Sequence, residues 1–291
     1  MKITKNKNLK DYNTYKLNAI CKTFIEIDAE EELIKLINNI KEPYKIIGNG
    51  SNLILPEYIK GIIIHLNLKD IYIKNNEITA SSGVLLPNLV NKTINNNLTG
   101  LEWASGIPAS LGGAIMNNAG AYKHSILDFI TKIKVLENNQ IKEITKDEIK
   151  ASHHQTNLKN KNIIILSATL KLEKGNKEES LNLIKEYTQK RINSQPINYP
   201  SAGSVFQNPE GDYAGKIIES LGLKNFHIKD AYISEKHANF IINKGSATSK
   251  DILELIKIIK DQCKREYNIN LKLEQEIINE NLKQNVRLTN A

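Results

Sequence analysis

The sequence SGIPASLGGAIMNNAGAY, at residues 105–122, is unusually rich in glycine and other small residues. Its glycines, at positions 106, 112, 113 and 120, lie among alanines and serines, so the segment is too poor in large side chains to build a dense core. It can instead let a flat or phosphorylated ligand lie close against the backbone, with Asn117, Asn118 and Tyr122 supplying hydrogen bonds at its end. Close helix packing, or a glycine-rich loop without a ligand, is the alternative.

A second glycine segment, YKIIGNGSNL, occupies residues 44–53. A buried strand is expected to run into a loop in which Gly48 and Gly50 permit a tight turn and expose backbone amides, while Ser51 and Asn52 add short polar side chains. An ordinary tight turn explains this loop better when it is taken alone. Two such segments about sixty residues apart, however, favour a bound cofactor.

Composition restricts the class of protein. The 291 residues, of which 40% are hydrophobic and 25% charged, suffice for two domains with a core in each. The formal net charge is +8, but only three of the 40 basic residues are arginine and the lysines are scattered, which argues against specific nucleic-acid binding. A basic surface still favours a small anionic substrate.

Location and metal content follow from a few residues. No apolar run approaches the roughly 18 residues that a membrane helix needs, so no membrane insertion is expected. Cys21 and Cys263 lie far apart in sequence and fit a reducing, cytoplasmic compartment. No Cys/His group has zinc spacing, and the adjacent His153 and His154 are a poor chelating pair, so no metal is expected.

Along the chain, helical and strand patterns are mixed in a way that predicts an α+β fold rather than a regular alternation of βα units. Helices are predicted at 30–40, 86–97, 177–193, 213–221 and 249–266, the last with Ser249 as its N-cap. Hairpins are predicted at 70–82 and 129–143, and strands at 44–47, 61–66, 162–172, 238–243 and 271–277. The Gln195-Pro196 and Tyr199-Pro200 breaks mark the best domain boundary.

Two segments near the C-terminus carry polar groups. In PSAGSVFQNP, residues 200–209, a turn presents the Ser204 hydroxyl near the Asn208 amide, although an ordinary Ser/Thr turn explains the pattern better in isolation. In LKLEQEI, residues 271–277, strand alternation would put Leu271, Leu273, Gln275 and Ile277 on one face. Glu274 and Glu276 would then share the other, solvated face.

Taken in order, these segments resemble the UDP-N-acetylenolpyruvoylglucosamine reductase family, the flavoenzymes that make UDP-N-acetylmuramate for peptidoglycan. The matching segments are Asn13-Thr14, 48–52, 106–122, 201–209, 214–224, 234–241 and 273–277. The resemblance covers nearly the whole chain up to about residue 280. Because Ser204 follows the Gln195-Pro196 break closely, the chain resembles the shorter subtype, which lacks a tyrosine-bearing insertion.

The resemblance implies a particular domain plan. An FAD-binding region of the vanillyl-alcohol-oxidase type would span residues 1–175, with subdomains at about 1–66 and 67–175. A connecting helix and linker would span 176–200, and a substrate-binding domain 201–291. NADPH would reduce FAD and leave, and the enolpyruvyl nucleotide sugar would take its place. The protein would then work in the cytoplasm as a monomer, without nucleic acid.

The resemblance also implies roles for single residues. Flavin N5 would deliver hydride to the vinyl carbon, and Ser204 would protonate the resulting enolate. Glu276 would stabilise that enolate, either by donating a hydrogen bond when protonated or by acting through another donor, with Glu274 as the alternative residue. The expected substrate contacts are Asn208 and Tyr122. The expected FAD contacts are Gly48, Asn49, Gly50, Ser51, Asn52, Gly106, Ile107, Pro108, Gly112, Gly113, Asn118, Gly120 and Tyr122.

One departure from the family pattern concerns positive charge. The family's Tyr-Arg-x-Ser stretch corresponds here to ASHHQTNL, residues 151–158, which puts His154 at the arginine and Thr156 at the serine. Either His154, or its neighbour His153, acts as an imidazolium, or a lysine reaches in, or catalysis is impaired. The alternatives are therefore another FAD oxidoreductase of the same fold and a nucleotide-sugar binding protein that has lost catalysis.

Overall fold

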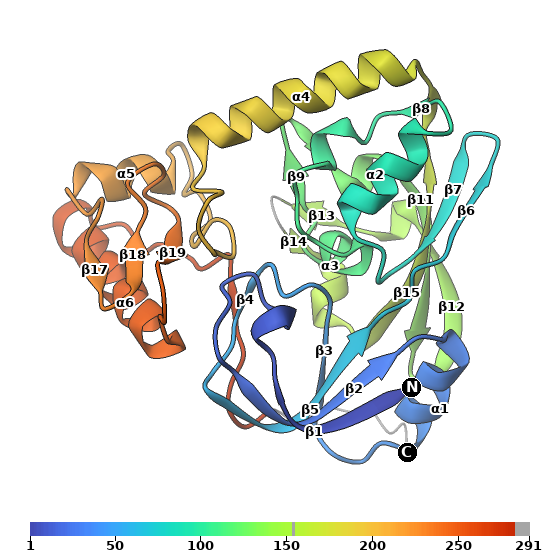
Figure 1. Cartoon of the computed structure of the whole chain (residues 1–291), viewed down its shortest axis with the longest axis horizontal. Helices are drawn as coiled ribbons and strands as arrows, with labels where there is room; N and C mark the ends of the chain where they lie inside the picture. The colour runs from blue at the N-terminus through green and yellow to red at the C-terminus, as the bar shows by residue number, and fades with distance from the viewer. Residues whose placement is uncertain (153–154, 283–291) are drawn as a thin grey trace.

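The structure, a computed structural model, describes residues 1–152 and 155–282 and confirms the α+β class. A four-stranded sheet in the order β1-β2-β5-β3 forms the lower part of the molecule (Figure 1). Its strands are β1 (Lys2–Asn8), β2 (Ile20–Ile27), β3 (Tyr44–Ile47) and β5 (Tyr58–Leu66). Because β3 pairs in parallel with β5, the chain must leave the end of β3 through a connection, and residues 48–52 begin it.

The helix α1 (Glu30–Asn39) connects β2 to β3. Three glutamates in its first turn complement the positive end of the helix dipole. Leu33 and Ile37, four residues apart, lie on one face and are buried against the first sheet's core.

A five-stranded antiparallel sheet in the order β12-β11-β15-β7-β6 forms the second unit. Its strands are β6 (Ile71–Lys74), β7 (Glu77–Ser81), β11 (Ile130–Glu137), β12 (Gln140–Thr145) and β15 (Ile163–Lys171). Both predicted hairpins are confirmed, and asparagines in the left-handed region make their turns: Asn75 in one, Asn138 and Asn139 in the other. The helices α2 (Leu86–Ile94) and α3 (Leu111–Met116) share a hydrophobic core with this sheet.

The helix α4 (Lys177–Ser194) crosses the top of this unit and leads toward the C-terminal part (Figure 1). Asn176 caps its first turn, accepting from the amides of Glu178 and Glu179. The buried carboxylate of Glu102 accepts a hydrogen bond from Ser180 at 2.6 Å, which fixes the helix to the sheet unit.

The C-terminal part packs α5 (Ala214–Ser220) and α6 (Ser249–Tyr267) with a small antiparallel sheet. The strands of that sheet are β17 (His227–Ile228), β18 (Ala231–Ile233) and β19 (Ile241–Asn243). The hydrophobic core of this C-terminal part also contains Tyr15, Leu17 and Ile54 from the N-terminal part of the chain. Segments far apart in sequence therefore share one core here.

The remaining strands have two residues each and join neighbouring loops. They are β4 (Leu53–Ile54), β8 (Leu98–Thr99), β9 (Gly120–Ala121), β10 (His124–Ser125), β13 (Ala151–Ser152), β14 (Gln155–Thr156), β16 (Glu173–Lys174) and β20 (Glu276–Ile277).

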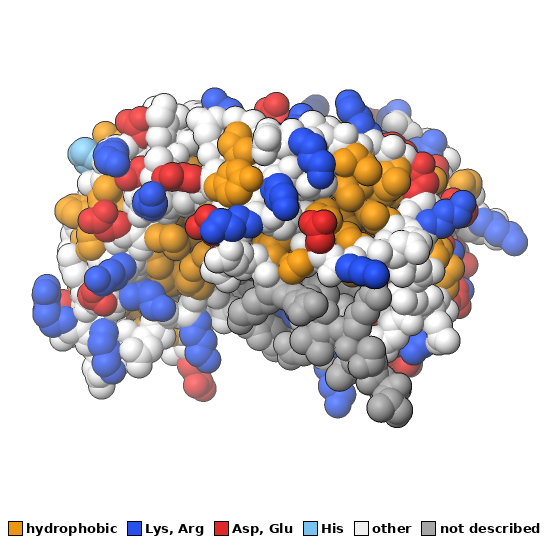
Figure 2. Space-filling model, turned by 90° about the horizontal axis from the view of Figure 1, so that it is seen from below, with side chains coloured by type: hydrophobic (Ala, Val, Ile, Leu, Met, Phe, Trp, Pro, Cys, Tyr) orange, Lys and Arg blue, Asp and Glu red, His pale blue; other side chains and the backbone are white. Residues whose placement is uncertain are grey.

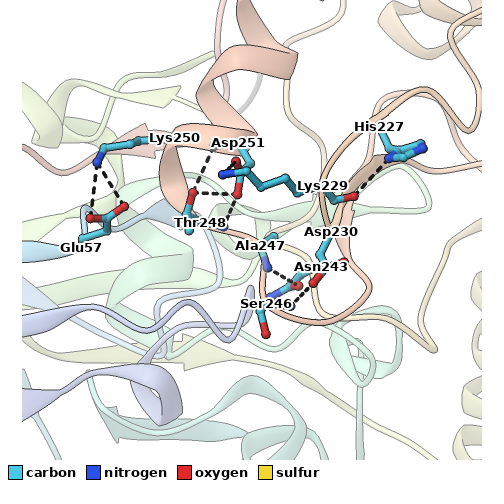
Figure 3. A network of polar contacts seen from close by, with 10 residues as sticks. All are labelled: Glu57, His227, Lys229, Asp230, Asn243, Ser246, Ala247, Thr248, Lys250 and Asp251. Carbon is cyan, nitrogen blue, oxygen red and sulfur yellow. Dashed lines mark hydrogen bonds and ion pairs between the residues drawn. The ribbon is translucent and has the colours of Figure 1, made fainter.

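The start of α6 corrects one prediction. Thr248, not Ser249, is the N-cap, and it forms a reciprocal capping box with Asp251 (Figure 3). Lys229 pairs with the same aspartate, and Lys250 reaches Glu57 just before β5. The N-cap lies one residue earlier than predicted because Asp251 is three residues after Thr248, the spacing that a capping box requires.

The predicted strand 271–277 is largely wrong. Only Glu276–Ile277 is a strand, parallel to β4, and Leu273 forms an isolated bridge with Phe206. The chain bends at Gln275, so the simple alternation fails: Gln275 is buried, whereas Ile277 is exposed. Hydrogen bonds to two different loops, described below, impose this bend.

The described residues contain no helix that is long and apolar enough to span a membrane. On the face drawn in Figure 2, lysine and arginine side chains are interspersed with acidic and apolar ones instead of forming one patch.

Candidate functional site

The two glycine segments of the sequence lie against each other. The Asn49 side-chain amide donates to the carbonyl of Pro108 at 2.7 Å. A Cβ on Gly48 would lie 2.1 Å from the Ser110 hydroxyl, so only glycine permits this approach. The expected FAD contacts at 48–52 and 106–122 are thus brought into one place.

The loop 48–52 is also held by the beginning of the chain. Gly50 has φ +64°, and a Cβ there would lie 2.1 Å from the Tyr12 carbonyl oxygen. The amide of Thr14 donates to the Gly50 carbonyl at 3.3 Å. The buried Asn13 side chain shapes the neighbouring turn by bonding to backbone atoms of Leu9 and Leu17.

Buried polar atoms without partners border these segments. Thr14 Oγ1, Ser82 Oγ and Asn118 Oδ1 are buried and have no hydrogen-bond partner within residues 1–152 and 155–282. Thr14 adjoins loop 48–52, Asn118 lies within 106–122, and the backbone of Ser82 bonds to Gly112. Buried polar groups are almost always satisfied, so this cluster fits a large polar ligand such as FAD.

Ser204 lies on a loop that is held by hydrogen bonds. Gly203 has φ +75° and open space around it, and Ser204 forms an isolated antiparallel bridge with Phe240. The next residues are fixed by Asn239: its carbonyl accepts from Val205, and its side chain bonds to both the amide and the carbonyl of Phe206, at 2.9 and 2.8 Å.

Residues 274–276 join this loop to the glycine segment. The Glu274 amide donates to the Val205 carbonyl at 2.9 Å. The Asn52 side chain donates to the Glu274 carbonyl at 3.1 Å, and the Glu276 amide donates to the Asn52 carbonyl at 2.9 Å. The loop that carries Ser204, the segment 274–276 and loop 48–52 therefore belong to one hydrogen-bonded cluster, in which Asn52 and Glu274 are 222 residues apart in the chain.

The two carboxylates differ in a way that the sequence did not predict. Glu276 is about half exposed and forms an ion pair with Lys45 of β3. Glu274, expected on a solvated face, is instead largely buried, and burial raises its pKa to about 7 against the lowering effect of the Lys159 ammonium. The prediction of a solvated Glu274 is wrong because the loops that contain Asn52 and Val205 pack against its backbone.

Two lysines complete this group of charges. Lys45 pairs with Glu276, and Lys159 lies close enough to Glu276 and Glu274 for both carboxylates to oppose the fall in its pKa that burial causes. The sequence left open that a lysine reaches into the site, but among so many lysines nothing singled out these two. His154 and His153 lie outside the described residues.

Tyr122 is held at the other side of the glycine segment by α4. Its ring stacks on Tyr187 at 4.3 Å, and its hydroxyl donates to the Tyr187 carbonyl at 3.0 Å. One turn further, Arg191 packs on Gly106, where a Cβ would lie 2.8 Å from Arg191 Cδ. Burial lowers the pKa of Arg191, and the Tyr122 hydroxyl opposes that fall. Sequence reasoning missed Arg191, although Tyr187 and Arg191 share a helix face.

The other expected site residues lie at the start of α5, in β9 and in the two glycine segments. Asn208 Oδ1 accepts from the Ala214 amide at 3.0 Å, so this oxygen caps α5. Gly120 lies in β9, where a Cβ would come within 2.6 Å of the His124 carbonyl. Ile107 packs partly buried on the core of the second unit, and Ser51 is partly exposed in its turn.

Comparisons with known proteins identify relatives of this chain. A family model described as "UDP-N-acetylenolpyruvoylglucosamine reductase, C-terminal domain" matches residues 195–278, and one described as "FAD binding domain" matches residues 23–140. The UDP-N-acetylenolpyruvoylglucosamine reductase of Clostridium novyi is 38% identical over 278 residues, covering 94% of this chain and 91% of that protein. The enzyme of the same name from Caldanaerobacter subterraneus is 40% identical over 285 residues, covering 96% and 94%.

A solved structure gives the same result in three dimensions. The crystal structure of UDP-N-acetylenolpyruvylglucosamine reductase from Thermus caldophilus superposes with a TM-score of 0.83 at 32% identity, covering 96% of this chain and 98% of that one. Identity above 30% over almost the full length of both proteins shows common descent, and the FAD-binding fold expected from the sequence is confirmed. The chain belongs to the UDP-N-acetylenolpyruvoylglucosamine reductase family.

Proposed function

We propose that Ser204, Glu276 and loop 48–52 form the reaction centre for the activity of this family. The chain is an FAD-dependent oxidoreductase of peptidoglycan precursor synthesis, which reduces UDP-N-acetyl-3-O-(1-carboxyvinyl)glucosamine to UDP-N-acetylmuramate with NADPH. FAD, when bound, supplies the hydride that reaches the vinyl carbon. The observation that carries the residue assignment is the unbroken run of hydrogen bonds from Val205 through Glu274 to Asn52.

The binding surface is assigned to the two glycine segments. The residues at 48–52 and 106–122 hold FAD through backbone amides, and Thr14, Ser82 and Asn118 provide hydrogen-bonding atoms that the protein leaves unused within its described part. Tyr122 and Asn208 contact the substrate, Asn208 through its amide because its oxygen caps α5.

Ser204 gives the proton that the reduced substrate needs. Hydride addition leaves negative charge on the neighbouring carbon and its carboxylate, and this enolate is basic enough to take a proton from a hydroxyl, a very weak acid. Such a transfer needs fixed geometry, which the Asn239 bonds to Phe206 supply close to Ser204.

Glu276 acts on the enolate through Lys45. An ionised carboxylate beside a developing enolate would repel it, but an ammonium group held by that carboxylate stabilises it. The Lys45–Glu276 ion pair therefore supports the second of the two roles expected for Glu276. His154 remains our proposal for the charge that the family's arginine supplies.

The domain plan and setting complete the proposal. Residues 1–175 form the FAD-binding region, with subdomains at about 1–66 and 67–175. Residues 176–200 connect it to the substrate-binding domain at 201–291. The protein acts as a monomer in the cytoplasm, and the buried free thiols of Cys21 and Cys263 are compatible with a reducing compartment.

The test separates the two half-reactions under anaerobic conditions. Ser204→Ala should leave the bleaching of the flavin by NADPH intact, because that step delivers no proton to substrate carbon. Reoxidation by the enolpyruvyl substrate should slow by about 10²-fold or more, as expected for loss of a general acid. Ser201→Ala, which removes a hydroxyl three residues away, is the matched control and should slow neither step. Equal slowing of both steps by Ser204→Ala would contradict the assignment.

The absent arginine favours one competing function, a nucleotide-sugar binding protein that has lost catalysis. Such a protein would bind the substrate, yet its NADPH-reduced flavin would not be reoxidised by it. In another FAD oxidoreductase of the same fold, NADPH would bleach the flavin, but this substrate would neither bind nor reoxidise it.

A further inference from the structure

Gln275, between Glu274 and Glu276, has a buried side chain whose amide oxygen and nitrogen both form hydrogen bonds. It is 4% exposed. Its oxygen accepts from the Tyr15 hydroxyl at 3.0 Å, and its amide donates to the carbonyls of Ala202 and Gly203 at 3.1 and 3.2 Å. One side chain thus grips the two peptide units that precede Ser204.

Tyr15 connects this grip to the cofactor loop. Its side chain is fully buried, and burial raises the pKa of the phenol, so the hydroxyl remains a hydrogen-bond donor at ordinary pH. The preceding residue, Thr14, donates its amide to the Gly50 carbonyl. The Tyr15 carbonyl accepts a hydrogen bond from the side-chain amide of Asn243, and the backbone amide of Asn243 donates to the Pro200 carbonyl. Tyr15 therefore holds the 200–204 segment at both ends.

The hydrogen bonds from Gln275 fall on both sides of the α-carbon of Gly203, which has no side chain to fix the backbone. Gly203 has φ +75°, and a Cβ added there would meet none of the described atoms within 4 Å, so no side-chain packing at this residue fixes the peptide units before Ser204, and their hydrogen bonds to Gln275 do so instead. Rotation there would move the Ser204 hydroxyl, whereas Val205 and Phe206 are held separately by Asn239. A misplacement of about 1 Å at a reacting group costs on the order of 10²-fold in rate.

We propose that Tyr15 and Gln275 are a positioning pair that holds the Ser204 hydroxyl in register with the cofactor loop 48–52. The pair acts only through Ser204, so the proposal rests on the role of Ser204 proposed above. Neither residue meets the reacting atoms. Their effect is confined to the step in which the proton reaches substrate carbon.

The experiment measures both half-reactions in the flavin-loaded enzyme, for Tyr15→Phe, Gln275→Met and Ser204→Ala. Tyr15→Phe keeps the ring and removes one hydrogen bond, so reoxidation by substrate should slow about 5- to 10-fold. Gln275→Met frees both carbonyls, and reoxidation should slow about 10²-fold. Flavin reduction by NADPH should change less than about two-fold in each, because positioning of Ser204 does not enter that step. Tyr72→Phe, on an exposed tyrosine, controls for loss of a phenol.

Double variants separate positioning from a general structural role. In the Ser204→Ala background, Gln275→Met should slow reoxidation no further, because no hydroxyl remains to be positioned. Tyr15→Phe should likewise add nothing to Gln275→Met. Multiplied effects in either pair, or equal slowing of NADPH reduction, would overturn the proposal. If Ser204→Ala alone leaves reoxidation unchanged, the proposed role of Ser204 has failed, and the positioning proposal fails with it. Should Gln275→Met not fold, Tyr15→Phe with and without Ser204→Ala decides the question.

Discussion

The buried carboxyl of Glu274 should make the protein less stable as the pH rises, and Glu274→Gln should remove that part of the pH dependence. Burial raises the Glu274 pKa from 4.5 to about 7. The folded state therefore keeps a proton that the unfolded chain has already lost between these values. Stability contributed by this proton is fully present below about pH 4.5 and is lost as the pH rises through about 7.

The size of the effect follows from the same shift. At 1.36 kcal/mol per pKa unit, the rise from 4.5 to about 7 corresponds to about 3 kcal/mol when the group is fully ionised. Glutamine has a similar shape and never ionises. Relative to the wild type, Glu274→Gln should therefore gain about 2 to 3 kcal/mol of unfolding free energy between pH 5 and pH 8.

Urea denaturation of both proteins, with the same excess of FAD, measures this gain at each pH. Taking the difference between the two proteins cancels the contributions of the titrating groups that do not interact with Glu274, which excludes Lys159. Parallel stability profiles for wild type and Glu274→Gln would show that the pKa of Glu274 is not raised in the folded state, as expected for a carboxyl on a solvated face.

Three further predictions concern the site. If Glu276 acts through Lys45, Lys45→Met should slow substrate-driven reoxidation about as much as Glu276→Ala; a harmless Lys45→Met combined with a mild Glu276→Gln would point to direct donation by Glu276. Gly113→Val should fold yet lose bound flavin, because a Cβ there meets only the Ser110 hydroxyl at 3.3 Å among the described atoms. Gly50→Val should fail to fold, because Gly50 has φ +64° and a Cβ there would clash with the Tyr12 carbonyl. Full flavin occupancy in Gly113→Val would contradict the assignment of the flavin site. If His154 supplies the positive charge, reoxidation should fall as the pH rises through the range in which histidine loses its proton, and His154→Arg should abolish this fall; a fully active His154→Ala would exclude the role.

Patterns within short segments predicted many of the regular elements, although not β1 and β2. The hairpins at 70–82 and 129–143 were both predicted, and the structure confirms both. Helix α4 was predicted from residues 177–193 and spans Lys177–Ser194. Such elements depend on neighbours a few residues away, which the sequence displays directly.

The C-terminal segment was mispredicted because distant residues determine it. Within LKLEQEI the local pattern favours a strand, but Gln275 bonds to Tyr15, which is 260 residues away, and Asn52 holds the Glu274 carbonyl. These bonds bend the chain, bury Gln275 and largely bury Glu274. Local periodicity does not detect contacts between residues so far apart in the chain, so the burial of Glu274 was not predicted, whereas the exposure of Glu276 was.

The hydrogen bonds that assemble the site run mainly through backbone groups and asparagine amides. Asn52 and Asn239 join loops that no regular strand connects, and the Glu274 and Glu276 amides complete the links. Because an asparagine side chain carries the same donor and acceptor as a peptide unit, it can replace a missing strand neighbour. The Ser204 hydroxyl takes no part in these links, and the Glu276 carboxylate contributes only a half-exposed pair with Lys45, worth about 0–1 kcal/mol. The framework therefore does not depend on the groups proposed to act on the substrate. Substituting Ser204 or Glu276 should change rates while leaving the fold intact, whereas Asn239→Ala, which strands two buried backbone groups of Phe206, should lower stability by about 2 kcal/mol or more.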